Sequence, residues 1–171
     1  MAAPAPDFLF DGPARGKRIV MLAHGAGAPM DTPFMTAIAE GLAAEGLRVA
    51  RFEFPYMAER RQSGRRKPPD RELVLIDTLR VAIAALGKPD KLRTAHLEKL
   101  RTPALIVQGT RDPFGTKDDV AAYKLAKTIR LHWSEDSDHD LKPRKASGRT
   151  HAEALAEAVA AAAQFISKLK G

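Results

Sequence analysis

Two residues that could do chemistry, an aspartate and a histidine, each follow a buried-strand pattern in the second half of the chain. Asp112 comes shortly after the apolar run Ala104–Val107 and the turn residue Gly109. Open α/β sheets place their sites at the carboxyl ends of parallel strands, and a proline after Asp112 disfavours a helical backbone there. His139 lies in the loop after the next strand pattern, Ile129–Trp133. A carboxylate at a strand end can orient a histidine, so this order predicts an acid–base pair.

Both residues also have a simpler interpretation. Asp-Pro is a common turn pair, so Asp112 could serve only its own loop. His139 could be a surface histidine, and its neighbours Asp136, Asp138 and Asp140 would favour the imidazolium form, which is unhelpful for a free base.

A glycine-rich loop, His24–Pro29, follows the apolar run Arg18–Ala23. Glycines there would let the backbone approach a ligand closely. We interpret the His24 imidazole as a structural group that bonds the loop backbone. A metal site made of His24, Asp112 and His139 would have no recognised ligand spacing, so no metal and no other cofactor is expected.

Alternating strand and helix patterns position these residues. Apolar runs predict four main strands and a short edge strand, over residues 18–23, 47–54, 104–108, 129–133 and 8–10. Start and stop signals predict helices that follow Thr32-Pro33, run from Asp70 to Gly87, run from Thr116 to Leu125 and follow Thr150. The basic segment Pro55–Pro69 is predicted to be a loop, and a short helix is expected around Leu92–Leu100. The alternation predicts an α/β protein with a mostly parallel sheet.

Composition narrows the class of protein. With 171 residues, 44% of them hydrophobic, the chain is expected to form one domain over residues 1–171. It has no cysteine, which excludes disulfides and thiolate chemistry. No secretory signal or bilayer-spanning run is present, so a cytoplasmic protein without a membrane partner is expected. The net charge of +7 indicates affinity for anions, but the basic runs Arg60–Lys67 and Lys142–Arg149 lack interleaved aromatic residues, so no nucleic-acid partner is expected.

Several segments carry a family pattern in one fixed order, namely Leu22–Met35, Arg51–Met57, Lys67–Pro69, Lys91–Leu97, Gln108–Gly115, Asp138-His139 and Lys142–Thr150. In these residues the chain resembles the α/β-hydrolase superfamily, most closely the dienelactone-hydrolase-like branch shared with a testis-expressed protein and a subunit of the NSL histone acetyltransferase complex. The resemblance implies that Asp112 is the acid and His139 the base of a catalytic triad. It also implies that backbone N–H groups of Gly25 and Ala26 belong to an oxyanion-hole loop.

The nucleophile that this resemblance implies is missing. The family carries a Gly-x-Ser-x-Gly elbow before the acid strand, and the sequence contains no such motif. Gly87 is followed directly by Lys88, where the family has a strand–elbow–helix–strand unit; a βαβ unit takes roughly 30 residues or more. The sequence therefore indicates an internal deletion near residues 87–88, and the nucleophile is unknown. None of the five serines is expected on a strand-to-helix turn.

The expected fold is thus a reduced α/β-hydrolase three-layer sandwich that lacks the central nucleophile strand and the next one. Its sheet would close by pairing Arg18–Ala23 with Ala104–Gln108, or by forming a homodimer through exposed sheet edges. The expected function is an ancestral serine esterase or dienelactone-hydrolase-like activity on a small ester. Two alternatives are a non-catalytic module that binds an anionic ligand or a protein partner, and a deletion form of an ordinary serine hydrolase.

Overall fold

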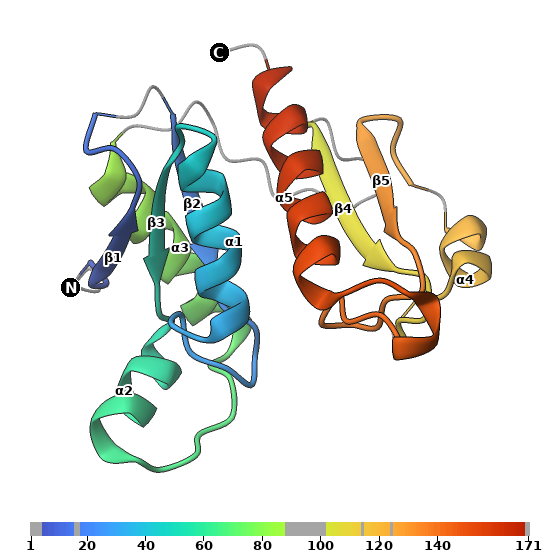
Figure 1. Cartoon of the computed structure of the whole chain (residues 1–171). Helices are drawn as coiled ribbons and strands as arrows, with labels where there is room; N and C mark the ends of the chain where they lie inside the picture. The colour runs from blue at the N-terminus through green and yellow to red at the C-terminus, as the bar shows by residue number, and fades with distance from the viewer. Residues whose placement is uncertain (1–4, 16–17, 88–101, 114, 124, 170–171) are drawn as a thin grey trace. The chain divides into compact units, whose positions relative to one another are not determined.

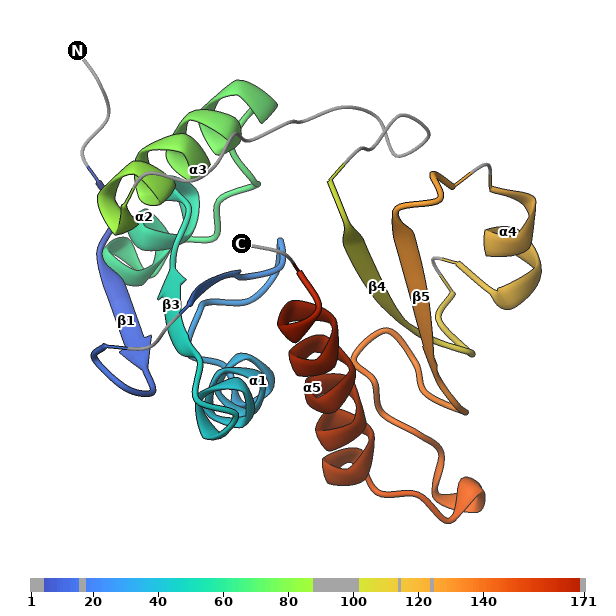
Figure 2. The same ribbon diagram turned by 90° about the horizontal axis from the view of Figure 1, so that it is seen from above.

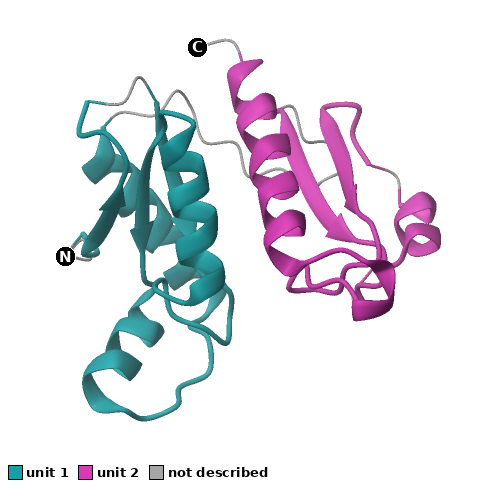
Figure 3. Ribbon diagram, in the orientation of Figure 1, with its two compact units in different colours: residues 1–90 teal, residues 91–171 magenta. Residues whose placement is uncertain are grey.

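The computed structural model describes residues 5–15, 18–87, 102–113, 115–123 and 125–169. The chain divides into two compact units, residues 1–90 (unit 1) and residues 91–171 (unit 2), which Figure 3 shows in different colours. Each unit is described by itself, and the expectation of a single domain stays a prediction. The helix expected around Leu92–Leu100 lies outside the described residues. Among the described helices, none combines the length and the apolar character needed to cross a lipid bilayer.

Unit 1 is built on a three-stranded sheet. Its strands β1 (Phe8–Asp11), β2 (Ile19–Ala23) and β3 (Arg48–Phe52) lie in the order β1-β3-β2, with β1 antiparallel and β2 parallel to β3. The helices α1 (Pro33–Ala44) and α3 (Glu72–Leu86) cover opposite faces of this sheet (Figures 1 and 2). Unit 1 therefore has the three layers that the sequence predicts.

The central strand of this sheet is β3, although the mixed faces of its sequence favour an edge or near-edge position. Val49, Ala50 and Phe52 are fully buried. The charged side chain of Arg51 is tolerated in the same strand because Asp11 binds it through two hydrogen bonds of 2.9 Å. A buried ion pair, rather than solvent, accounts for the charged residue in the pattern.

Three of the four predicted helix starts are confirmed. The Thr32 side chain accepts a hydrogen bond from Met35 N at the start of α1, and Pro33 is its first residue. In unit 2, α4 (Lys117–Ala122) and α5 (His151–Ser167) begin at capping boxes, in which Thr116 pairs with Asp119 and Thr150 with Glu153. Such caps satisfy N–H groups that the first helical turn leaves unpaired.

Two local predictions are wrong. The predicted loop 55–69 begins with a helix, α2 (Pro55–Ser63), because Pro55 suits a first turn and good helix formers follow it. Asp70 does not cap α3, whose N-cap is Arg71. Instead, the Asp70 carboxylate accepts a hydrogen bond of 2.9 Å from Tyr56 N and so ties the segment before α3 back to α2.

Unit 2 is built on a two-stranded parallel sheet, β4 (Ala104–Gly109) and β5 (Ile129–Ser134). Helix α5 packs against both strands and buries Ala154, Ala158 and Val159. Both strands were predicted, and both end in loops that carry the candidate site.

Within unit 1, β2 pairs with β3, and within unit 2, β4 pairs with β5. The pairing expected between Arg18–Ala23 and Ala104–Gln108 would join the two units and stays a prediction. An uninterrupted apolar run identifies a strand that can be buried on both faces, but it does not specify the neighbouring strand. The sequence therefore predicts the strands correctly, and the neighbours of β2 and β4 beyond their own units stay a prediction. Closure by a second copy of the chain stays a prediction.

Candidate active site

The loop that follows β4 holds Asp112 in a defined position. Thr110 N donates to Ser134 O at 3.1 Å and extends the pairing of β4 with β5 by one step. Asp112 N then bonds Gly109 O at 3.1 Å, and Asp112 O accepts from Gly115 N at 3.2 Å, so the backbone forms the turn that Asp-Pro predicts. The side chain does more than serve this turn. Only 3% of the residue is exposed, and its carboxylate contacts His139.

The acid and the base are brought together. His139 Nδ1 lies 2.9 Å from Asp112 Oδ2, with the imidazole 63% exposed and the carboxylate buried. A hydrogen bond to an ionised carboxylate requires Nδ1 to carry a hydrogen, so the neutral ring has its lone pair on Nε2. This is the tautomer that a general base needs, with the acid oriented to support the imidazolium once it forms.

A further residue of the site, Gln108, was not singled out from the sequence. Its Nε2 donates to Asp112 Oδ2 at 2.8 Å and to Gly115 O at 3.2 Å. The same carboxylate oxygen thus receives hydrogen bonds from Gln108 and from His139. The signal in the sequence was a single amide side chain near the end of an otherwise apolar strand, where the pattern alone would place an apolar residue.

The loop that carries His139 is organised by its own carboxylates. Asp138 Oδ1 accepts from the backbone N–H groups of Asp140 and Lys142, at 3.0 Å each. Asp136, in the left-handed region with φ 54°, binds the Arg144 guanidinium and accepts from Arg144 N at 3.0 Å. The Arg144 hydrogen bond holds the pKa of the Asp136 carboxyl below its usual value. Two of the neighbouring acids expected to act on the imidazole, Asp136 and Asp138, therefore have structural partners within the loop.

Gly109 allows this loop to cross the end of β4. A Cβ atom added to Gly109 would lie 2.3 Å from Asp138 O and 2.4 Å from Ser137 O. The contact is fixed from both sides, because Arg111 N donates to Ser137 O at 2.9 Å and Asp136 N donates to Thr110 Oγ1 at 2.8 Å. The close approach of the two loops is what sets Asp112 opposite His139.

The glycine-rich loop lies in unit 1, whereas Asp112 and His139 lie in unit 2. His24 is buried; its Nε2 accepts from Phe54 N at 3.1 Å, and its Nδ1 lies 2.7 Å from Gly25 O. Both ring nitrogens thus hold the backbone, in agreement with the structural interpretation of His24. A Cβ added to Gly25 would meet nothing within 4 Å, and Ala26 O accepts from the Tyr56 hydroxyl at 3.4 Å.

The five serines have hydroxyl groups bound to other parts of the protein. Ser63, Ser147 and Ser167 each donate to a backbone carbonyl three or four residues earlier. Ser134 and Ser137 are fully buried, and their hydroxyl oxygens lie 2.8 Å apart. Ser134 is the last residue of β5, but it points into this buried pair and no helix follows it directly. In the described chain, no cluster of three or more His, Cys, Asp and Glu residues could hold a metal ion.

The two basic runs stabilise loops. In the first run, Arg61 forms two hydrogen bonds of 2.9 Å to Asp31 and two more to Glu53. Burial raises the pKa of the Glu53 carboxyl, but Arg61 and Met30 N outweigh burial, so the pKa lies below its usual value. In the second run, Arg144 and Arg149 bind Asp136 and Glu157. Four of the nine cationic residues in these runs, Arg61, Lys67, Arg144 and Arg149, are therefore paired with acids.

Comparison with known proteins agrees with this geometry. A family model described as an alpha/beta hydrolase domain matches residues 16–87 and residues 82–167, so the chain belongs to the α/β-hydrolase family. A comparison with curated proteins found no match.

Solved structures share the fold at low sequence identity. An α/β serine hydrolase homologue from Coxiella burnetii is 16% identical, with a TM-score of 0.62 over 91% of this chain and 90% of that chain. A serine hydrolase without a lid from Xanthomonas campestris is 17% identical, with a TM-score of 0.63 over 96% and 91%. Est1E from Butyrivibrio proteoclasticus is 16% identical, with a TM-score of 0.54 over 98% and 100%. The predicted fold class, an α/β-hydrolase fold reduced to 171 residues, is confirmed. The narrower likeness to the testis-expressed and NSL proteins stays a prediction.

Proposed function

We propose that this chain keeps the acid and base of an ester hydrolase of the dienelactone-hydrolase-like kind, and that it uses them without a serine elbow. One observation carries the proposal: the buried Asp112 carboxylate holds Nδ1 of the exposed His139 ring at 2.9 Å. A mechanism without a serine elbow is supported by the absence of a Gly-x-Ser-x-Gly motif and by the engaged hydroxyl groups of the five serines.

In the proposed reaction, His139 Nε2 takes a proton from a water molecule as the water oxygen attacks the ester carbonyl. Asp112 stabilises the imidazolium that forms, and the imidazolium then gives its proton to the departing alcohol. The oxyanion-hole role that the resemblance implies for the backbone N–H groups of Gly25 and Ala26 stays a prediction. A positioned general base contributes about 10²- to 10⁴-fold, so the expected activity is modest.

Two other functions each have an observation in their favour. The engaged serines favour a non-catalytic module on the same fold. The family match in two segments that meet at residues 82–87 favours a deletion form of an ordinary serine hydrolase. The sequence of the native gene across Gly87-Lys88 tests the deletion form directly, because an intervening strand–elbow–helix segment would establish it.

Hydrolysis of p-nitrophenyl acetate separates the catalytic from the non-catalytic function. His139→Ala should remove most of the rate above the buffer background, and Asp112→Asn should lower it strongly. His151→Ala is the matched control, because this histidine lies in the same unit but bonds Asp140 O. Equal rates for His139→Ala and wild type would refute catalysis by the pair. Fluorophosphonate labelling that one serine substitution abolishes would refute the serine-free mechanism.

A further inference from the structure

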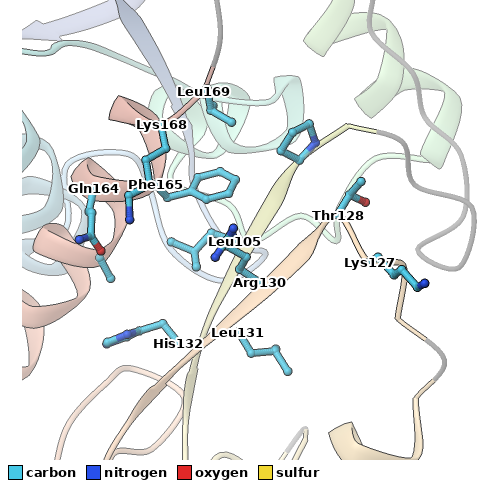
Figure 4. Close-up of a pocket in the computed structure, with 12 residues that line it drawn as sticks. Leu105, Lys127, Thr128, Arg130, Leu131, His132, Gln164, Phe165, Lys168 and Leu169 are labelled. Atoms are coloured by element: carbon cyan, nitrogen blue, oxygen red, sulfur yellow. The ribbon is translucent and has the colours of Figure 1, made fainter.

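A pocket lies in unit 2, away from the candidate active site. It has a volume of about 560 Å³ and is lined by residues of β4, β5 and α5 (Figure 4). Its strand residues are Leu105 of β4 and Arg130, Leu131 and His132 of β5, whereas Asp112 and His139 follow the carboxyl ends of these strands. The pocket is therefore distinct from the acid–base pair.

The charge of this pocket has one sign. Lys127, Arg130 and Lys168 line it, and none of the described residues that line it is acidic. Within the part of the chain that the structure describes, no ion pair engages any of these three side chains. This distinguishes them from Arg61, Arg144 and Arg149, which bind acids.

The pocket also has an apolar side. Figure 4 shows the Phe165 ring projecting from α5 toward Leu105 and Arg130, with Lys168 just after the end of this helix and Lys127 at the far rim. An aromatic ring beside unpaired cations suits a ligand with an apolar body and an anionic head. The anion would gain charge-assisted hydrogen bonds from the guanidinium and ammonium groups.

Two features of unit 2 would weaken the binding of an anion in this pocket, and nearby positive charges outweigh both of them. The carboxyl end of α5 carries about half a negative charge, against three formal positive charges in the pocket lining. Glu157 lies 3.0 Å from His132 Nε2, a pocket residue, but Arg149 also pairs with this glutamate and offsets its charge.

We propose that this pocket binds a small amphiphilic anion, a carboxylate or phosphate attached to an apolar group, with Arg130 and Lys168 holding the anion and Phe165 and Leu105 the apolar part. This site does not depend on the proposed hydrolase function, because none of its residues belongs to the acid–base pair.

Titrations followed by amide chemical shifts test the site on the full chain. The probes are phenyl phosphate and phenylacetate, with benzyl alcohol as the uncharged analogue. Both anions should give saturable shifts at Leu105, Arg130 and Phe165, and benzyl alcohol should bind about tenfold more weakly or not at all. A higher affinity for phenyl phosphate than for phenylacetate would indicate a phosphate site, and the reverse order would indicate a carboxylate site.

The double variant Arg130→Gln/Lys168→Gln should weaken binding of the anions by about tenfold or more. Lys142→Gln is the matched control, because Lys142 is an exposed lysine of the same unit that does not line the pocket. Phe165→Leu, which keeps an apolar side chain, should weaken all three probes together. Equal affinity of the double variant and wild type, equal binding of benzyl alcohol, or unsaturable shifts spread over the basic surface would overturn the proposal.

Discussion

Substitution of Gly109 by alanine should separate the acid from the base. The added Cβ would lie 2.3 Å from Asp138 O, and real Cβ contacts are essentially never shorter than 3.0 Å. The crowding atoms belong to the backbone of the His139 loop, so a side-chain rotation cannot relieve the clash. The loop or the end of β4 must therefore move by about 0.7 Å or more.

This displacement is enough to break the central contact. His139 follows Asp138 directly, and a retreat of the loop along the line of its 2.9 Å hydrogen bond would leave Nδ1 about 3.6 Å from Asp112 Oδ2, too far for a hydrogen bond. Overpacking costs about 1–3 kcal/mol, and weakening the bond from Arg111 N to Ser137 O adds about 1 kcal/mol. The free energy of unfolding should fall by about 2–4 kcal/mol.

Urea unfolding and the amide chemical shifts of residues 136–142 measure these two effects. Gly115→Ala is the control within the same unit, because its Cβ would meet Gln108 Nε2 at 3.5 Å, an ordinary contact. We expect Gly115→Ala to change the free energy of unfolding by less than about 1 kcal/mol. If Gly109→Ala retained wild-type stability and wild-type loop shifts, the proposed crossing of the two loops would be wrong.

Three further perturbations test the elements that support the units. Arg144→Gln should make the His139 loop less sensitive to acid. The pKa of Asp136 lies below its ordinary value of 3.8, so the pairing with Arg144 stabilises the fold above that value and is lost as the pH falls through the lowered pKa. Acid titration followed by NMR should show this loss only in wild type. Arg51→Ala should lower the free energy of unfolding of unit 1 by about 3–5 kcal/mol in urea, because it leaves the Asp11 carboxylate without its buried partner; an effect below about 1 kcal/mol would contradict this role. Thr150→Ala should cost about 1 kcal/mol through loss of the α5 cap, with Thr150→Ser close to wild type in the same assay.

The sequence predicted the strands and most helix starts because those features are local. Four apolar residues before Gly109 are enough to indicate β4, and a threonine three residues before an acid is enough to indicate the starts of α4 and α5. The helix α2 was missed because the prolines and basic residues around it suggested a loop.

Contacts between distant segments were harder to predict. The order Asp112 then His139 indicated a pair only together with the family resemblance, and the distance between their atoms depends on a loop crossing at Gly109 that no periodicity describes. The same limit explains Gln108, whose partner is four residues away in a turn. Strand neighbours are determined by the whole fold rather than by the strand's own residues.

The tautomer of His139 is the most direct test of the acid–base pair. Long-range ¹H–¹⁵N NMR spectra of the neutral ring should show Nδ1 protonated and Nε2 unprotonated in the wild-type chain. In Asp112→Asn, the preference for this tautomer should weaken, since the amide cannot replace both acceptor oxygens of the carboxylate. A wild-type ring protonated on Nε2, or a tautomer unchanged by Asp112→Asn, would contradict the assignment of Asp112 and His139 as a working acid and base.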